Sequence, residues 1–296
     1  MTTPRRQSDQ VFIIGMILSM TCWGFSWTSG KILSQYGDPL TISLIRFGVT
    51  VLSLIAVVLV LKEKLQLKRA GFFDLLIAGM LLSIYTYVFF KGLMLGKAGA
   101  GGVLVTVLNP IVAYAITIIL ARRKPTRREM LGLSLGLVAG FVLLKVFSSP
   151  GDIIKAGNIY FLLAAIVWAV LSRYTARASR YGSSISFSFW LYVVSTLMMS
   201  FLAGVNPSIH VLKNADSLFW WNLFFSATIT TALATTFYFV ATARVGASQA
   251  SSFIFLVPFS AALGSWTFLC ETIELHTIIG GLLGIAAVYV LNLRKR

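Results

Sequence analysis

The chain has 296 residues, of which 57% are hydrophobic and 11% charged, and its mean hydropathy is +0.86. A soluble domain carries about twice that charged fraction, so the composition excludes an ordinary water-soluble fold. A net charge of +16 would suggest nucleic-acid binding in a soluble protein. Here the basic residues lie between long apolar runs, so we expect a lipid bilayer and no nucleic acid as the surroundings of the chain.

Ten apolar runs are long enough to cross a bilayer, which takes about 20 residues of helix. They span residues 11–30, 40–61, 72–93, 98–120, 129–147, 157–172, 184–204, 218–241, 247–270 and 276–293. Only helices and closed barrels satisfy their backbone hydrogen bonds in lipid, and runs of this length are helical. The sequence therefore predicts an all-α membrane protein with ten transmembrane helices.

The basic residues are distributed unequally between the segments that join these runs. With the N-terminus in the cytoplasm, 18 of the 25 lysines and arginines fall on the inside and six on the outside. The six outer ones are Lys31, Lys91, Lys97, Lys145, Lys155 and Lys213. An excess of basic residues on the cytoplasmic side is the usual rule for membrane proteins. We therefore expect both termini in the cytoplasm and a location in a bacterial inner membrane.

The hydrophobic pattern occurs twice along the chain. When Pro110 is aligned with Pro258, no gap is needed through the following 33 residues. The matched pairs are Ala113 with Ala261, Gly132 with Gly280, Gly136 with Gly284, Val142 with Val290 and Leu143 with Leu291. We predict two five-helix repeats, residues 1–150 and 151–296. Five is an odd number, so the second repeat enters the membrane from the opposite side, an inverted duplication typical of secondary transporters.

Several short motifs in both halves carry a resemblance to a known family. They are Cys22-Trp23-Gly24-Phe25, Asp38-Pro39 followed by Arg46, Ala98-Gly99-Ala100-Gly101-Gly102, Leu108-Asn109-Pro110, Gly246-Ala247-Ser248-Gln249-Ala250, and Leu256-Val257-Pro258 followed by Glu271 and Gly280. In order and spacing the chain resembles the ten-helix, EamA-like branch of the drug/metabolite transporter superfamily. That resemblance implies export of amino acids and other small metabolites, or import of nucleotides, vitamins or cofactors. The family often has a Glu after each Leu-x-Pro helix, but the first half has Arg123 at that place.

Arg46 is the clearest charge inside a predicted span. Charged residues in a membrane usually face the interior of the bundle or a cavity. Arg46 lies seven residues beyond Pro39, roughly 10 Å below the outer end of the helix at 1.5 Å per residue. It is a candidate for binding a substrate carboxylate or phosphate. The alternative is a structural side chain that reaches the interface or bonds to backbone carbonyls.

Aromatic and hydroxyl side chains supply the other candidate binding residues. Binding sites are mostly apolar walls with a few polar groups, and aromatic rings can hold an ammonium group. The predicted substrate-binding set is Trp23, Ser26, Arg46, Tyr87, Asn109, Trp168, Thr235, Tyr238 and Ser252. Ser83, Tyr85, Thr106, Thr231, Ser251 and Phe255 belong to the same pattern. The alternative is that the tryptophans and tyrosines are interfacial or lipid-facing.

Pro110 and Pro258 each remove a backbone hydrogen bond from a predicted span, which favours a kink. One interpretation is a pair of symmetric hinges for alternating access. The other is close packing and a bend without a role in motion. The nine acidic residues and both histidines lie in loops or near helix ends, so no titrating group suited to proton coupling stands at mid-bilayer.

Taken together, the residues and the resemblance predict a secondary transporter for a small polar or amphipathic metabolite. Efflux of amino acids or related compounds is the first expectation. Uptake or exchange of a nucleotide-, vitamin- or cofactor-like solute is the alternative, and a channel is a third. We expect no enzymatic activity, no metal site and no bound cofactor, because no nucleophile–base or metal-ligand pattern is present. An internally duplicated chain is expected to work as a monomer, with a dimer left open.

Overall fold

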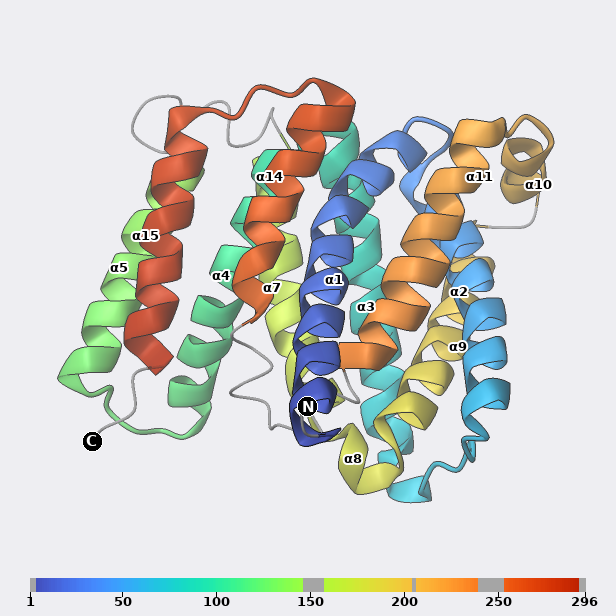
Figure 1. Cartoon of the computed structure of the whole chain (residues 1–296), viewed down its shortest axis with the longest axis horizontal. Coiled ribbons are helices and arrows are strands. Elements are labelled where there is room, and N and C mark those ends of the chain that lie inside the picture. The colour runs from blue at the N-terminus through green and yellow to red at the C-terminus, as the bar shows by residue number, and fades with distance from the viewer. Residues whose placement is uncertain (1–3, 146–156, 204–205, 239–252, 293–296) are drawn as a thin grey trace.

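The computed structural model describes residues 4–145, 157–203, 206–238 and 253–292 (Figure 1). Across these ranges the chain is helical and contains no strand. The long helices are α1 (Pro4–Leu33), α2 (Pro39–Leu61), α3 (Phe72–Leu95), α4 (Ala98–Leu120), α5 (Arg127–Leu143), α7 (Asn158–Thr175), α9 (Ser184–Ala203), α11 (Ser217–Phe224) continuing into η2 (Phe225–Ala234), α14 (Leu256–Leu269) and α15 (Leu275–Asn292). Short turns of helix are η1 (Arg69–Gly71), α8 (Ala178–Tyr181), α10 (Asn206–Lys213) and η3 (Phe253–Phe255).

Each of the ten predicted spans coincides with one of the long helices, which confirms the all-α fold. Six described helices meet the length and hydropathy expected of a membrane-crossing helix, and α14 and α15 are shorter apolar helices. Two expectations were wrong. The fifth helix ends at Leu143, because Lys145 turns the chain with a φ of 53°. Residues 206–213, expected as loop, form α10. The predicted start of the ninth span, at residue 247, lies outside the described residues.

Local sequence signals explain where several helices begin. Asp38 accepts hydrogen bonds from the backbone N–H groups of the first turn of α2, and Pro39 takes the first helical position, where its missing N–H costs nothing. Thr126 and Glu129 form a reciprocal capping box at the start of α5. Asp216 caps α11 by accepting from Phe219 N. These caps satisfy backbone donors that a helix end leaves without intrahelical partners.

The helix contacts repeat when the two halves are exchanged. In the two repeats α1 corresponds to α7, α3 to α11–η2 and α4 to α14. The contact between α1 and α14 therefore has its counterpart between α7 and α4, and the contact between α3 and α7 has its counterpart between η2 and α1. All four contacts are present. The contacts α2–α9, α4–α14 and α5–α15 map onto themselves. In Figure 1, α5 and α15 lie at one side of the molecule and α2 and α9 at the other, with α1, α3, α4, α7 and α14 between them.

Reciprocal side-chain contacts show the same symmetry at atomic scale. A Cβ atom added to Gly132 would lie 2.7 Å from Leu291 Cγ, and one added to Gly280 would lie 2.6 Å from Leu143 Cγ. The glycines and the leucines are the pairs that the sequence repeat matches. A contact in which i meets j′ and j meets i′ is the signature of a two-fold relation. This is the inverted five-plus-five arrangement.

Two tyrosine–aspartate hydrogen bonds repeat the relation at opposite ends of the bundle. Tyr36 Oη donates to Asp216 Oδ1 over 2.6 Å, and Tyr181 Oη donates to Asp74 Oδ2 over 2.7 Å. Each bond joins one half of the chain to the other.

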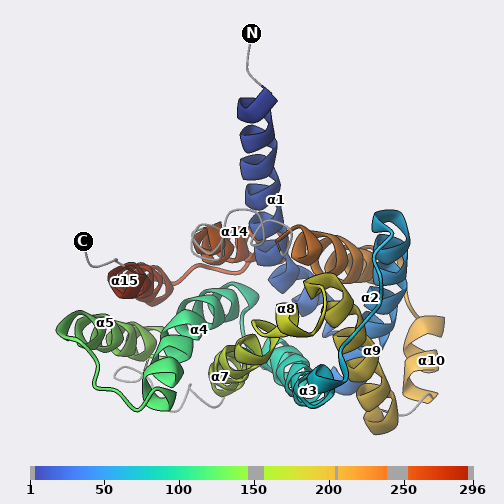
Figure 2. The same cartoon turned by 90° about the horizontal axis from the view of Figure 1, so that it is seen from below.

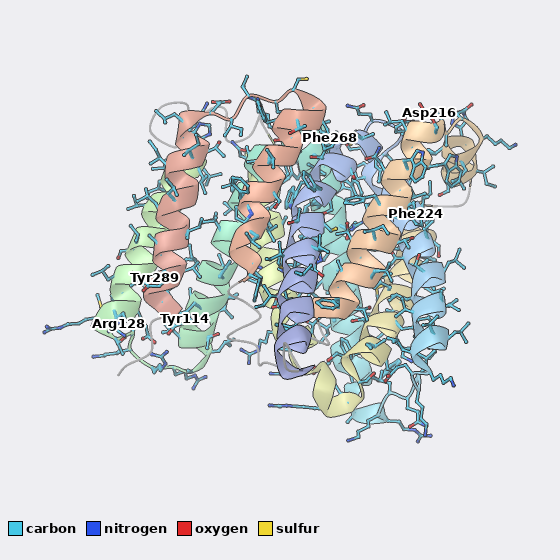
Figure 3. The ribbon with its side chains drawn as sticks, in the orientation of Figure 1. Tyr114, Arg128, Asp216, Phe224, Phe268 and Tyr289 are labelled. Carbon is cyan, nitrogen blue, oxygen red and sulfur yellow. The ribbon has the colours of Figure 1, made fainter. Side chains whose placement is uncertain are left out.

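Asp216 lies at the upper end in Figure 3, where Phe224 and Phe268 point outward from their helices. Exposed large apolar side chains such as these give the helix faces the surface that lipid requires.

Figure 2 shows the bundle from the end at which α1 begins and α15 finishes. Because both lie at this one end, the chain crosses the membrane an even number of times. The basic loop around Arg123 and Arg128 and the short helix α8 occupy the same end in Figures 1 and 3. The charge distribution predicts that this end is cytoplasmic.

Candidate functional site

Arg46 lies inside the bundle, on the face of α2 that packs against η2. Its Nη2 donates a hydrogen bond of 2.9 Å to Thr231 Oγ1, while its Nε is buried and has no hydrogen-bond partner in the described part of the chain. The phenol groups of Tyr85 on α3 and Tyr192 on α9 are near enough to interact electrostatically with the guanidinium, and no carboxylate of the described ranges forms an ion pair with it. The charge is therefore held within the membrane by neutral groups.

Aromatic rings extend from this point into the second half of the molecule. Tyr85 packs against Trp168 of α7 with ring centroids 4.6 Å apart, and against Phe89 at 5.9 Å. Trp27 continues the row, at 4.8 Å from Phe89. Arg46, Tyr85, Trp168 and Tyr192 are each partly buried.

The helix opposite Arg46 has an unusual backbone. Residues Phe225–Ala234 form a π-helix. This form is rare in proteins, and where it occurs it is often at a functional site. Thr231 Oγ1 donates to Ser226 O over 2.7 Å, five residues back, and accepts from Arg46. Ser53 and Thr228 are joined by a hydrogen bond of 2.7 Å between α2 and the same π-helix. Hydroxyl groups thus line the contact between these two helices.

A second aromatic pair lies between α1 and the continuation of η2. Trp23 packs against Tyr238 with ring centroids 5.2 Å apart. Thr235 uses its hydroxyl for a bond to Thr230 O, and Ser26 for a bond to Trp23 O within its own helix. The structure therefore pairs Trp23 with Tyr238, and it connects Trp168, through Tyr85, to the surroundings of Arg46. Ser26 and Thr235 use their hydroxyls for backbone bonds within their own helices and have no described contact with Arg46.

The remaining predicted residues have other positions. Tyr87 is 37% exposed, on the face of α3 that also exposes Met80 and Ile84. Tyr85 and Tyr87 are two residues apart, about 200° around a helix, so they lie on different faces of α3. A role of Tyr87 in substrate binding stays a prediction. Asn109 is partly exposed on α4, without a described contact to Arg46. Ser252 lies outside the described residues.

The two prolines are not equivalent in their helices. Pro110 lies inside the continuous helix α4, whereas Pro258 is the third residue of α14, directly after η3. A proline in a first turn costs little, because the N–H it lacks has no intrahelical acceptor there.

Tyr192 was not among the predicted residues. Ser188, Tyr192 and Ser195 repeat at helical spacing on α9, and this polar stripe could have drawn attention to it.

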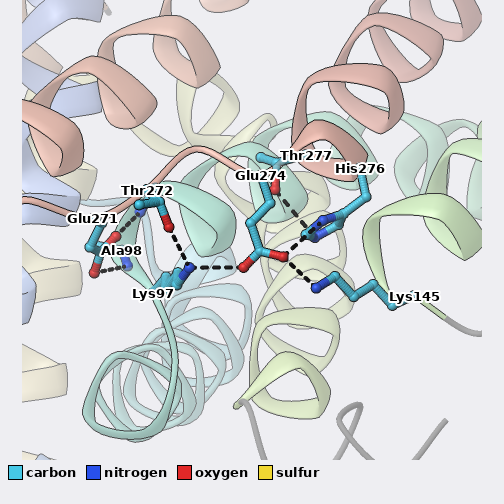
Figure 4. A network of polar contacts seen from close by, with 9 residues as sticks. Lys97, Ala98, Lys145, Glu271, Thr272, Glu274, His276 and Thr277 are labelled. Carbon is cyan, nitrogen blue, oxygen red and sulfur yellow. Dashed lines mark hydrogen bonds and ion pairs between the residues drawn. The ribbon is translucent and has the colours of Figure 1, made fainter. Parts of the chain in front are cut away.

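A cavity of about 360 Å³ lies at the other end of the bundle, which the charge distribution predicts to be the outer one. Three lysines and two glutamates line it, together with small polar residues of α14 and α15. Glu274 bridges Lys97, at 2.8 Å, and Lys145 (Figure 4). Lys31 Nζ donates to the backbone oxygens of Leu93 and Gly96. The network connects the ends of α1, α3, α4 and α5 to the loop between α14 and α15.

Glu271 links the two halves at this cavity. Its carboxylate oxygens accept hydrogen bonds from Ala98 N (3.0 Å) and Gly99 N (3.1 Å), so it caps α4 from the far side of the repeat (Figure 4). A carboxylate at a helix N-terminus also interacts favourably with the helix dipole. Arg123, at the equivalent place in the first half, instead makes two hydrogen bonds of 2.7 Å to Glu129. The two positions therefore have different roles.

The Glu274 bridge should make stability depend on pH. Hydrogen bonds from Lys145 and Lys97 lower the pKa of Glu274 from 4.5 to about 2. A lowered carboxyl pKa stabilises the fold at pH values above the ordinary pKa, and this contribution is lost as the pH falls through the folded pKa. We expect Glu274→Gln to lower the thermal midpoint by a few degrees at pH 7, and this difference to shrink below about pH 4.5. Glu63→Gln, outside any described ion pair, should leave the midpoint unchanged at pH 7. A difference that stays constant down to pH 3 would contradict the bridge.

The sequence matches one known protein family over nearly its whole length. The sequence model of the EamA-like transporter family matches residues 10–145 and 155–293. The chain belongs to the EamA-like transporter family. Relatives of this EamA-like transporter include the uncharacterized transporter YoaV of Bacillus subtilis, 23% identical over 94% of this chain and 95% of the relative. An uncharacterized transporter of Archaeoglobus fulgidus is 24% identical over 96% and 99% of the two chains.

Two further similarities extend the comparison. The WAT1-related chloroplastic protein At3g02690 of Arabidopsis thaliana is 25% identical over 68% of this chain and 50% of its own length. A solved crystal structure matches 96% of this chain and 96% of its own, with 17% identity and a TM-score of 0.60, which shows a shared fold. The family match makes the chain a multi-pass membrane transporter, and the solved structure shows a shared fold.

Proposed function

We propose that this EamA-like transporter exports amino acids or related small amphipathic metabolites across the inner membrane, by alternating access of its two halves to the two sides. One observation carries the proposal. Arg46 of the first half bonds to Thr231 of the second, and Tyr85 of the first half, which interacts electrostatically with Arg46, packs on Trp168 of the second. A site shared by two inverted repeats is where secondary transporters bind their substrate.

The chemistry of this position suits an amphipathic solute. The guanidinium and the hydroxyls of Tyr85, Tyr192 and Thr231 offer polar contacts, while the rings of Tyr85 and Trp168 offer an apolar wall. Sites of this kind combine apolar walls with a few polar groups that fix orientation. The cytoplasmic orientation of both termini, inferred from the basic loops, belongs to the same proposal.

Counterflow in proteoliposomes tests the function. Vesicles loaded with a mixed pool of amino acids should accumulate a labelled amino acid from outside, and uptake should saturate with concentration. Trp168→Ala should reduce the rate about tenfold, because the ring that forms part of the apolar wall is removed. An aromatic contact is worth roughly 0.5–1.5 kcal/mol beyond its buried area. Trp221→Ala, whose ring is 71% exposed on α11, is the matched control.

The alternative functions give different results in the same vesicles. A channel would equilibrate the label without saturation and without counterflow. Exchange of nucleotides but not of amino acids would replace the proposed substrates by the alternative ones. If no solute of either class exchanges through folded protein, the export proposal is wrong.

A further inference from the structure

The guanidinium of Arg46 has more hydrogen-bond donors than the described protein has acceptors for it. An arginine side chain carries five N–H donors and cannot lose its charge. Thr231 Oγ1 accepts one of them, and Nε is buried without a partner within the described residues. A buried donor without an acceptor destabilises the protein, and more so when it is charged. An anion placed beside Arg46 would remove that cost.

The acidic residues of the described chain are engaged elsewhere. Most of them have partners at helix ends: Asp38 caps α2, Asp74 accepts from Tyr181, Glu129 pairs with Arg123, Asp216 accepts from Tyr36, Glu271 caps α4 and Glu274 bridges two lysines. Charges within a membrane are generally paired or face a polar cavity. The counter-charge for Arg46 is therefore missing from its described surroundings.

Neighbouring groups indicate which anion would fit. Tyr85 and Tyr192 hold no described hydrogen bond through their hydroxyls, and both rings keep accessible surface. A single guanidinium with two hydroxyl donors matches one negative charge, and arginine pairs with a carboxylate through two parallel N–H···O bonds. The adjoining Tyr85–Trp168 pair, at 4.6 Å, offers a flat apolar surface for the rest of the solute.

We propose that the substrates are small carboxylates with an aromatic or apolar body, anchored by the carboxylate to Arg46, and that an amino group is not required for recognition. The inference rests on the proposed transport function and narrows its substrate class. We infer that an amino group is not required because no described carboxylate is among the groups that interact with Arg46. An ammonium group would find no opposite charge among these groups, whereas the solute carboxylate finds one.

A series of three compounds with the same phenyl body tests this inference on the wild-type protein. Phenylpropanoate carries the carboxylate alone, phenylalanine carries both groups, and phenethylamine carries the amine alone. Each competes with labelled substrate in counterflow, and each is titrated calorimetrically into purified protein in detergent. We expect both compounds with a carboxylate to compete at least tenfold more strongly than phenethylamine, since a charge-assisted hydrogen bond is worth about 1.5–3 kcal/mol.

Variants separate recognition from folding. Arg46→Lys keeps the charge but loses the paired geometry, so it should weaken phenylpropanoate binding and still prefer it to phenethylamine. Arg46→Gln should abolish that preference. If Arg46→Gln does not fold, the wild-type series decides alone. Thr231→Val, which removes the one described partner, tests whether Thr231 positions the guanidinium, and should weaken the carboxylates without reversing the order.

The outcomes distinguish the inference from the function on which it rests. Counterflow in which phenethylamine competes as well as phenylpropanoate overturns the carboxylate anchor and leaves transport standing. An unchanged preference in folded Arg46→Gln also overturns it. If wild-type protein neither exchanges nor binds any of the three compounds, the carboxylate class is wrong, and counterflow with the mixed amino-acid pool then shows whether the proposed export is wrong as well.

Discussion

Phe161→Ala is expected to lower the free energy of unfolding by about 3 kcal/mol, the range found for large aromatic side chains removed from a core. Phe161 on α7 is fully buried. Its ring occupies the space left by the missing side chains of Gly92 on α3 and Gly101 on α4. A Cβ atom on Gly92 would lie 2.7 Å from the ring, and one on Gly101 would lie 2.5 Å from it. Trp27 packs on it with ring centroids 5.9 Å apart. The side chain thus holds α7 of the second half between α1, α3 and α4 of the first.

The measurement is the thermal midpoint of purified protein in detergent, followed by size-exclusion chromatography after heating. Leu163→Ala is the matched control, because Leu163 is on the same helix and 41% exposed. In lipid or detergent an exposed leucine gains little from packing on protein, so its removal should shift the midpoint only slightly. Equal shifts for the two variants would show that the packing of Phe161 does not join the halves.

Glu271→Gln is expected to loosen the outer end of the molecule. The variant retains one acceptor oxygen for the N-terminus of α4 but loses the second acceptor and the charge. The loss of a helix cap typically costs about 1–2 kcal/mol, and 1–2 kcal/mol changes an equilibrium between two states roughly 5- to 30-fold. The cap ties α4 to the end of α14, so the equilibrium that shifts is the separation of these two helices at the outer cavity.

Labelling of a cysteine in the cavity measures that separation. Ser265 is buried, lines the cavity and lies beside Gly99. In protein that carries Cys270→Ala, which removes an exposed native cysteine, the rate of maleimide modification of Ser265→Cys should rise about tenfold when Glu271→Gln is added. Thr267→Val, an exposed change near the same end of α14, should leave the rate unchanged. An unchanged rate in both variants would mean that the cap does not hold the outer end closed.

The candidate site was predicted in part. Arg46, Trp168 and Thr231 could be named because a charge, a large ring or a hydroxyl inside an apolar run is rare. Tyr192 could have been found from its spacing to Ser188 and Ser195. The sequence does not choose between Tyr85 and Tyr87, because α3 carries apolar residues on nearly every side and its pattern does not reveal which face looks inward. In a membrane the lipid-facing and the buried faces of a helix are both apolar.

Glu271 illustrates a second limit. The repeat alignment reveals that its counterpart is Arg123, but the partners of the two side chains lie on other helices, Ala98 and Gly99 in one case and Glu129 in the other. The π-helix at η2 is a further case: the threonines that bond five residues back, Thr231 and Thr235, follow an ordinary apolar pattern in sequence. Nothing local distinguishes that turn from an α-helix.

The sequence by itself determined the ten helices, their approximate ends and their inverted pairing. These properties depend on run length, on caps and on the matched prolines and glycines, all of which are local or repeat along the chain. Only the tertiary structure decided which side chains meet. The surroundings of Arg46, the carboxylate cap on α4 and the lysine bridge at Glu274 each join segments more than a hundred residues apart. Such contacts follow from how helices pack, and helix packing in lipid depends on shape complementarity between faces that are equally apolar.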